Sequence, residues 1–523
     1  MVLPRRLPIG IQSFESIIND GYLYIDKTDF IYRLVHKGKP YFLSRPRRFG
    51  KSLLLSTMKA YWEGRRELFK GLKIEDMEKE NTDAWQSHPV FYFDFNKGNF
   101  QEKGVLEAIF EFQIGEWEEK YGMTVKGAPL GVRFGQLLKN AYEQTGKKCV
   151  VLVDEYDKPL LETIGKKELA EHNKAVFKGF FSTLKAEDAH LKFVFITGVT
   201  KFSKVSIFSD LNQLEDISFD VDYSAICGIT DKEIVKNLMP EIESMARERN
   251  LSIDDCKDRL KYQYDGYHFS ADGEGVYNPY SLLNALKKRR FGSFWYETGT
   301  PTFLAHRLKE MSFDVRQFSD RTVQSTESIL SDYRNDNPDP IPLLYQTGYL
   351  TLKACSDDVY TLGFPNEEVR YAFLQSLMPE YVNDCGSGSG KDIFALRRHI
   401  DEGNLEGVKK VLIALFASIS YTTNDTPFEH YFQTVIYIVF TLLKQYAECE
   451  LHTSAGRIDC VVETGRYIYI FEFKRDKSAE EALKQIDENK YADRYIADER
   501  KLYKIGVNFE SKTRQMTEWK VEA

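Results

Sequence analysis

The segment that most constrains the fold is Cys149–Val153, five apolar residues of which three are valine, followed at once by Asp154 and Glu155. An unbroken apolar run of this length is typical of a strand buried on both faces, since a strand with one solvent-facing side alternates apolar and polar residues. Helical patterns separate this run from three similar ones, which are Pro40–Leu43, Val90–Phe95 and Phe193–Thr197. The alternation predicts a parallel sheet covered by helices in the N-terminal half.

The remainder of the chain changes pattern twice. From about Ile226 to Leu344 the pattern is mainly helical, and Gly386–Gly390 is a Gly/Ser run typical of a flexible linker. After the linker we expect helices at Asp392–Ser418 and Phe428–Tyr446, strands at Gly456–Val462 and Tyr467–Lys474, a helix from Ala479 and a strand near Tyr503–Val507. A length of 523 residues suggests two to four domains. The expected limits are 1–225, 226–385, a linker at 386–390, and 391–523.

A phosphate-binding loop is predicted at Arg45–Ser52, because the segment follows a strand and precedes a helix. N–H groups of the loop and of the helix N-terminus would cradle phosphates. Lys51 would reach the β- and γ-phosphates of ATP, and Ser52 would ligate Mg²⁺. Arg45 stands where the first glycine of such loops is expected, whereas the Gly-Lys-Ser end is intact. The expected ATP contacts in the loop are Arg47, Arg48, Phe49, Gly50, Lys51 and Ser52. The alternative is a basic turn that caps a helix.

The carboxylates that follow the valine-rich strand strengthen the nucleotide-binding hypothesis, because they come about 100 residues after the loop. Asp154 would hold the Mg²⁺ shell, and Glu155 would polarise the attacking water. Thr197 and Thr200 lie at the end of the next apolar strand. One of these threonines is expected to sense the γ-phosphate, and the alternative is a hydroxyl that caps the following loop.

A second constellation lies in the C-terminal region, where Asp459 precedes Glu472 and Lys474 by a strand and a turn. Residues two apart on a strand share a face, so Glu472 and Lys474 would lie together. A two-residue turn at Thr464-Gly465 would pair Asp459 with Ile470 and set it diagonally from Glu472, about 7–8 Å away between backbones. Two carboxylates at this separation suit Mg²⁺ or Mn²⁺. The metal would lower the pKa of a bound water, and Lys474 would orient or deprotonate that water.

Three other polar residues are candidates for this second site. Glu429, at the start of an amphipathic helix, would complete the metal shell, or it is a carboxylate that favours a helix N-terminus. Gln485 and Tyr491, on the next expected helix, would contact the metal site or nucleic acid. A solvated helix face is the alternative for these two, since charged residues surround them.

The N-terminal motifs resemble the AAA-ATPase-like family over roughly residues 5 to 290. The resemblance rests on LPIGIQSFESIINDGYLYIDKT, SRPRRFGKS, VLVDEYD, ITGVTKFSKVSIFSDLNQLEDIS and YDGYHFSADGEGVYNPYSLLNAL. It implies an α/β multidomain protein with a P-loop AAA-type parallel sheet and a mainly helical lid or middle region. In the last motif Asn278 fits a helix N-cap, and Pro279 fits the first helical turn.

Residues 391 to 520 resemble the PD-(D/E)XK nuclease superfamily, in the branch that commonly follows AAA-ATPase-like domains. The ordered context of helix, β-hairpin, helix and strand carries this resemblance, together with the filled core positions Glu429, Asp459, Glu472 and Lys474. It implies a C-terminal α/β restriction-endonuclease-like domain that uses a divalent metal ion.

Composition and local sequence patterns indicate the cellular setting and the kinds of partner that we expect for this protein. The seven cysteines form no C-x-x-C pair, the N-terminus lacks the apolar core of a signal peptide, and the apolar stretch near Val435–Leu443 is too short to span a bilayer. We therefore expect a cytoplasmic protein without a membrane partner. The net charge of −8 does not make the whole surface attractive to nucleic acid, although Lys287–Arg290 is a local basic run.

The favoured function is ATP binding and hydrolysis coupled to metal-dependent phosphodiester cleavage of nucleic acid, with DNA favoured over RNA. A role in defence or mobile-element control is a hypothesis that rests on architecture alone. One alternative is an ATP-driven switch whose C-terminal domain binds nucleic acid or a partner without cutting. Another is a signalling ATPase whose nucleotide state controls homo-oligomerisation. Lys474 favours cleavage, because binding alone would not need it, whereas the acidic net charge favours the alternatives.

Overall fold

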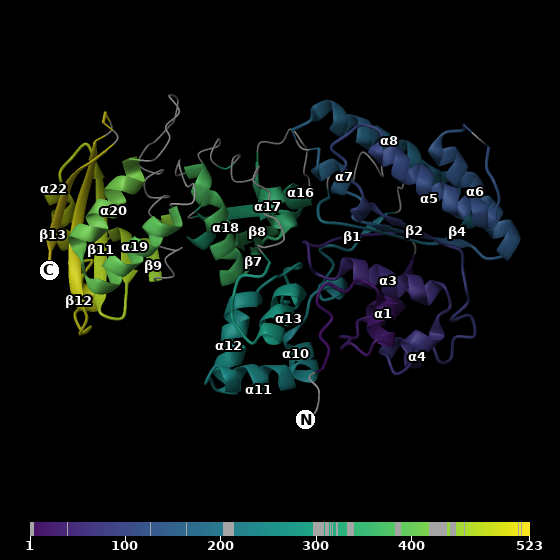
Figure 1. The fold of residues 1–523 in the computed structure, drawn as a ribbon, viewed down its shortest axis with the longest axis horizontal. Helices are drawn as coiled ribbons and strands as arrows, with labels where there is room; N and C mark the ends of the chain where they lie inside the picture. The colour runs from purple at the N-terminus through teal and green to yellow at the C-terminus, as the bar shows by residue number, and fades with distance from the viewer. Residues whose placement is uncertain are drawn as a thin grey trace. The chain divides into compact units, whose positions relative to one another are not determined.

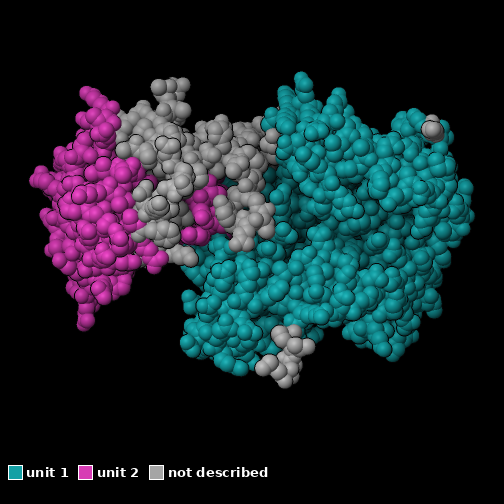
Figure 2. Space-filling model, in the orientation of Figure 1, with its two compact units in different colours: residues 1–297, 323–368 teal, residues 298–322, 369–523 magenta. Residues whose placement is uncertain are grey.

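The computed structural model describes most of the chain in two compact units. The described residues are 5–38, 40–125, 127–163, 165–201, 214–295, 308, 313, 315, 317–320, 323–331, 339–381, 389–417, 437–439, 446–453, 456–510, 512–513 and 515–523. Unit 1 comprises Met1–Glu297 and Val323–Glu368, and unit 2 comprises Thr298–Thr322 and Val369–Ala523 (Figure 2). In this described part, no helix is both long and apolar enough to cross a membrane.

These units divide the chain differently from the expected domain limits, which stay predictions. Unit 1 joins the first expected domain to most of the middle region, because the two share buried hydrogen bonds. Lys201 N, for example, donates to Gln346 Oε1 at 2.7 Å, and Gly228 N donates to Phe49 O at 3.2 Å. Of the expected linker, Ser389 and Gly390 begin a helix, and residues 386–388 lie outside the described part.

Unit 1 is built on the expected parallel sheet. Its strands are β1 (Tyr41–Ser44), β2 (Val90–Asp94), β3 (Cys149–Asp154), β4 (Leu191–Gly198) and β5 (Glu215–Asp216). They lie in the order β2-β3-β4-β1-β5, and each neighbouring pair is parallel. The prediction from the valine-rich run is confirmed, since all six residues of β3 are buried. Parallel pairing brings the carboxyl ends of β1, β3 and β4 to one edge of the sheet, where ligands of α/β proteins bind.

Helices cover both faces of this sheet (Figure 1). One face carries α5 (Val105–Tyr121), α6 (Leu130–Thr145) and α8 (Lys167–Ala186), and the other carries α1 (Phe14–Asn19), α3 (Lys51–Trp62) and α4 (Lys73–Met77). Beneath the first set, phenylalanine rings from β2 and the helices form the core, with Phe110 and Phe180 stacked at 4.0 Å and Phe93 edge-on to Phe180 at 5.3 Å. The remaining helices of this part are α2 (Thr28–Lys37) and α7 (Lys158–Leu161).

The middle region of unit 1, expected to be mainly helical, combines helices with a small sheet. It contains α10 (Asp231–Asn237), α11 (Met239–Glu248), α12 (Ile253–Tyr264) and α13 (Pro279–Lys288), which enclose an apolar core that includes Ile242, Leu260 and Leu282. Asn278 is the N-cap of α13 and accepts from Ser281 N, as predicted. The sequence did not predict the antiparallel sheet β6-β8-β7, formed by Val323–Thr326, Val359–Gly363 and Thr351–Ser356. Short helices α16 (Glu327–Ser331) and α17 (Ile341–Thr347) accompany it.

Unit 2 contains a five-stranded mixed sheet flanked by helices. The strands are β9 (Tyr446–Thr453), β10 (Gly456–Glu463), β11 (Tyr467–Arg475), β12 (Lys501–Glu510) and β13 (Gln515–Glu522), in the order β13-β12-β11-β10-β9. Only β11 and β12 are parallel, and α22 (Ala479–Glu488) connects them. The helical pattern expected at Asp392–Ser418 corresponds to two helices, α19 (Ser389–Glu402) and α20 (Leu405–Ala417). Helix α18 (Glu367–Tyr381) precedes them. Of the expected helix Phe428–Tyr446, residues 437–439 are helical, Tyr446 instead begins β9, and the other residues lie outside the described part.

Candidate nucleotide and nuclease sites

The predicted phosphate loop connects β1 to α3 at the carboxyl edge of the parallel sheet. Arg48 and Gly50 have positive φ values of 69° and 94°, so the chain bends late in the loop. Gly50 is the N-cap of α3, and because it has no side chain it leaves the first-turn N–H groups of α3 uncapped. Such N–H groups, together with the positive end of the helix dipole, form a ready anion site.

Lys51 is buried inside this loop, with 3% of its side chain exposed. Its Nζ donates to the carbonyl oxygens of Arg45 and Pro46 at 3.0 and 3.2 Å and lies 3.1 Å from Glu155 Oε1. An ammonium group buried in this way needs such partners, since an unpaired buried charge is costly. Phosphate oxygens would therefore bind to a lysine that the loop and Glu155 already hold in place.

Asp154 lies at the end of β3, beside the start of α3 and the end of β4. It accepts hydrogen bonds from Thr197 Oγ1 at 2.9 Å and from Tyr92 Oη at 3.4 Å. Burial and the charge of Glu155 raise the pKa of Asp154 to about 6, although a hydrogen bond from Ser52 and the charge of Lys51 act in the opposite direction. A hydroxyl and a carboxylate in contact are oxygen ligands that suit Mg²⁺, so Ser52 and Asp154 fit the expected ion.

The two candidate threonines have different surroundings. Thr197 contacts Asp154, whereas Thr200 directs both its backbone N and its Oγ1 to Asp157 Oδ2, at 2.6 and 2.7 Å. Asp157 is fully buried and also accepts from Val199 N at 3.1 Å. Thr197 therefore lies in the candidate nucleotide site, whereas Thr200 has the loop-capping position.

The other loop residues divide between the surface and the core. Arg47 and Arg48 are exposed, and the Arg48 guanidinium lies 4.9 Å from the centre of the Tyr280 ring. Phe49 is buried edge-on to Tyr267 and Phe269, at 4.8 and 5.4 Å between ring centres. Phe49 therefore anchors the loop in the core, and only its backbone can face a phosphate.

Sequence reasoning missed two residues of this site. Tyr92 on β2 reaches Asp154 from the neighbouring strand, and no sequence signal marks it beyond its place in an apolar strand. Asp157 caps the segment after β4, and its signal was available in the spacing Asp-Glu-Tyr-Asp that ends at residue 157.

The predicted nuclease residues of β11 face α22. Lys474 Nζ lies 2.9 Å from Glu472 Oε1 and also donates to Gln485 Oε1. Tyr491 Oη accepts from Gln485 Nε2 at 3.4 Å and from Asn489 Nδ2 at 2.7 Å. Four predicted residues, Glu472, Lys474, Gln485 and Tyr491, are thus brought together. Asn489 was not predicted.

Apolar side chains of the hairpin and of α22 pack next to this cluster. Ile470 and Val461 of the hairpin pack with Leu483 and Ile486 of α22, and Glu472 itself is only 2% exposed. The opposite face of β11 is also buried, since Phe471 and Phe473 stack at 6.0 Å. Both faces of the strand are therefore fixed by packing, which holds the carboxylate and the ammonium group on the α22 face.

The register of the β10–β11 hairpin differs from the one expected for a two-residue turn. Pairing runs from Glu463↔Ile468 to Cys460↔Phe471, so Ile470 pairs with Val461 and residues 464–467 connect the strands. Continuing this register by one residue sets the backbone of Asp459 directly opposite Glu472, not diagonal to it. A shift of two residues leaves each position on its original face, because side chains alternate with period two. The side chain of Asp459, and all of Glu429, lie outside the described residues, so their roles stay predictions.

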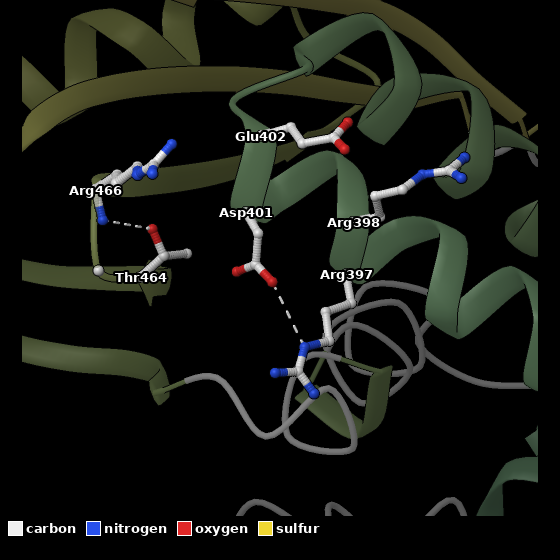
Figure 3. Close-up of a pocket in the computed structure, with 7 residues that line it drawn as sticks. Arg397, Arg398, Asp401, Glu402, Thr464 and Arg466 are labelled. Carbon is white, nitrogen blue, oxygen red and sulfur yellow. Dashed lines mark hydrogen bonds and ion pairs between the residues drawn. The ribbon is translucent and has the colours of Figure 1, made fainter.

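A separate hollow of about 570 Å³ lies at the other end of β11 (Figure 3). It is bounded by α19 and the β10–β11 turn, and its lining residues are Arg397, Arg398, Asp401, Glu402, Thr464, Gly465 and Arg466. Arg397 Nε lies 3.5 Å from Asp401 Oδ2, and Thr464 Oγ1 accepts from Arg466 N at 3.2 Å. Its position before the start of β11 separates this hollow from the Glu472–Lys474 cluster near the end of that strand.

Known proteins match both halves of the chain. Residues 8–208 match the family described as "Predicted AAA-ATPase", and residues 427–519 match the "PD-(D/E)XK nuclease superfamily". The chain is also 36% identical, over 532 residues and 99% of both chains, to a protein of Azotobacter chroococcum mcd 1 named "Uncharacterized protein in vnfD 5'region". The chain belongs to the family of AAA-ATPase-like proteins that carry a C-terminal PD-(D/E)XK nuclease superfamily domain.

Proposed function

We propose that unit 1 binds and hydrolyses ATP with Mg²⁺, and that unit 2 cleaves phosphodiester bonds of nucleic acid, DNA in preference to RNA. The observation that carries the proposal is the cluster of Glu472, Lys474 and Gln485 on one buried face of unit 2. A carboxylate next to an ammonium group on one strand supplies both a metal ligand and a cation for a phosphate. The family supports the coarser statement, an ATPase-type domain joined to a nuclease-type domain.

In unit 1, different residues would bind the phosphates, hold Mg²⁺ and activate the attacking water. Lys51 would exchange its ion pair with Glu155 for phosphate oxygens, and the first-turn N–H groups of α3 would cradle the phosphates. Ser52 and Asp154 would hold Mg²⁺, which when bound neutralises phosphate charge. Glu155, once released from Lys51, would polarise the attacking water.

In unit 2, Glu472 and Asp459 are proposed to hold a divalent metal ion, which supplies a bound water of lowered pKa. Lys474 would orient that water and stabilise charge on the scissile phosphate. Gln485 would hold the Lys474 ammonium group in place, and Tyr491 would fix the Gln485 amide by accepting from its Nε2. The Glu472–Lys474 contact favours this function over a binding-only domain, because desolvating a partly buried ion pair is costly and binding alone would not need it.

The test is cleavage of linear and circular DNA and of RNA by the purified full-length protein, with Mg²⁺ or Mn²⁺ and with or without ATP. We expect metal-dependent cleavage that ATP changes in rate. Calorimetry should show that Lys51→Ala loses ATP binding, whereas Lys59→Ala, an exposed lysine two turns later on α3, retains it. If no substrate is cleaved under any condition while ATP still binds, the ATP-driven switch replaces the nuclease as the function.

A further inference from the structure

The residue at the first position of the phosphate loop is a buried arginine. Arg45 is 1% exposed, although it occupies a position where glycine is expected in loops of this type. Its Nη1 donates to Ser44 O at 2.9 Å and to Ser218 O at 2.8 Å, and its Nη2 donates to Tyr223 O at 3.0 Å. The guanidinium also lies 4.1 Å from the centre of the Phe269 ring.

Burying a guanidinium this deeply is costly, so the position calls for an explanation. The neighbours that accept its hydrogen bonds are neutral carbonyls, and burial lowers the pKa of Arg45. Neutral carbonyls and an aromatic face compensate the charge less than a carboxylate would. These contacts instead fix the relative positions of the three carbonyl groups, because the planar guanidinium fixes the directions of its donors.

The segments that Arg45 connects are the entrance of the loop and the chain that follows β5. Its backbone N donates to Gly198 O at 3.1 Å, which extends the β1–β4 pairing. Ser44 N donates to Ser218 Oγ at 2.9 Å, next to the carbonyl that receives the guanidinium. The start of the loop is therefore held from two sides, by β4 and by the 218–223 segment.

The carbonyl oxygens of Arg45 and Pro46 are the ones that receive Lys51 Nζ. We propose that Arg45 is a positioning residue for nucleotide binding: its side chain fixes the loop entrance where other phosphate loops use glycine, and so places the carbonyls that hold Lys51. The inference rests on the proposed ATP binding of unit 1. Arg45 touches neither Glu155 nor Asp154 in the described contacts, so it should set affinity for ATP and not the rate of hydrolysis.

The test compares two variants. Arg45→Gly restores the usual glycine, whereas Arg45→Lys keeps the positive charge but can donate to only some of the three carbonyl oxygens that the guanidinium reaches. Arg33→Ala is the matched control, since Arg33 donates to Asp222 O at 3.1 Å in the same segment and lies over Phe30, away from the loop. ATPase kinetics, ATP affinity by calorimetry and the thermal midpoint without nucleotide are measured for each full-length variant.

We expect Arg45→Gly to raise the KM and Kd for ATP at least tenfold, with kcat within about threefold of wild type. Arg45→Lys should restore part of the affinity, and Arg33→Ala should match wild type. Wild-type ATP affinity in Arg45→Gly would overturn the inference. A fall in kcat at unchanged KM would also overturn the inference, because that pattern indicates that a smaller fraction of the protein is folded. If Arg45→Gly does not fold, Arg45→Lys with wild-type KM gives the same negative result. A wild-type protein that binds no ATP would refute the proposed function itself.

Discussion

Glu155 Oε1 lies 3.1 Å from Lys51 Nζ, so the carboxylate expected to polarise water is held by the lysine expected to bind phosphate. Glu155 also has a left-handed backbone, with φ of 54°. In the proposed function, ATP would take Lys51 from Glu155 before hydrolysis, and its binding would thereby release the carboxylate to polarise water.

The first prediction concerns this pair. Glu155→Gln should bind ATP at least as tightly as wild type, because the competing carboxylate charge is gone. Its turnover should fall about 10²–10⁴-fold, the usual contribution of a general base. Calorimetry measures the affinity for ATP, and steady-state ATPase assays measure the turnover. Weaker ATP binding in Glu155→Gln would contradict the idea that Glu155 and ATP compete for Lys51.

The second prediction concerns Lys474. Lys474→Ala should still bind metal and nucleic acid but cut at least about 10²-fold more slowly, because its charge acts in the transition state. Lys484→Ala is the control, since Lys484 lies on the exposed face of α22 beside Gln485, with its Nζ 3.4 Å from Glu488 Oε1. Equal cleavage by Lys474→Ala and wild type would assign the activity to another site or to a contaminant.

The third prediction concerns Asp459. Asp459→Ala should lose metal binding and cleavage together, since the register sets its backbone opposite Glu472. The fold should survive, because Ile470, Leu483 and Ile486 supply the apolar packing on this face of the sheet. Metal titration by calorimetry, with circular dichroism as the folding check, separates the two effects. Retained metal affinity would remove Asp459 from the ligand set.

The fourth prediction compares two glycines. A Cβ at Gly198 would come within 2.6 Å of Asp157 Oδ1 and 2.7 Å of the Tyr156 ring, so Gly198→Ala should lower the free energy of unfolding by about 1–3 kcal/mol. Gly179 lies on the exposed face of α8 with open space around it, so Gly179→Ala should be neutral or stabilising by up to about 1 kcal/mol. Denaturant titration measures both, and a stable Gly198→Ala would show that the segment after β4 can move.

The fifth prediction is a pH dependence. Burial and the neighbouring Glu155 raise the pKa of Asp157 to about 6, above its ordinary value of 3.8. The folded state therefore binds the proton more tightly than the unfolded state, and this group's contribution to stability is present below about pH 4 and lost as pH rises through 6. The difference in unfolding free energy between wild type and Asp157→Asn should shrink across this interval. A difference that grows with pH would contradict the raised pKa.

The strands that the sequence predicted are those with buried faces. Cys149–Val153 became β3, and helix α3 begins at Lys51 as the loop pattern required. By contrast, β13 was missed because its residues, among them Glu518 and Lys520, are mostly exposed and give no apolar signal. An edge strand of this kind is held by one neighbour, and charged residues suit it.

The site could be predicted where one motif carries the chemistry. Glu472 and Lys474 share a face because a strand alternates, and the structure brings Gln485 to them as expected. The burial of Arg45 could not be foreseen, because its acceptors Ser218 and Tyr223 lie more than 170 residues away in the chain. Tyr92 was missed for the same reason, since its neighbour Asp154 is 62 residues later.

The place of β11 in its sheet has a consequence for how cleavage can be controlled. β11 is the central strand of five, and its backbone pairs with β10 on one side and with β12 on the other. A central strand of this kind is expected to be among the last parts of its unit to open. The Glu472–Lys474 pair is therefore preorganised in the resting protein and cannot be switched off by local unfolding. Control of the proposed cleavage would then act on the access of substrate or metal to a site that is already built.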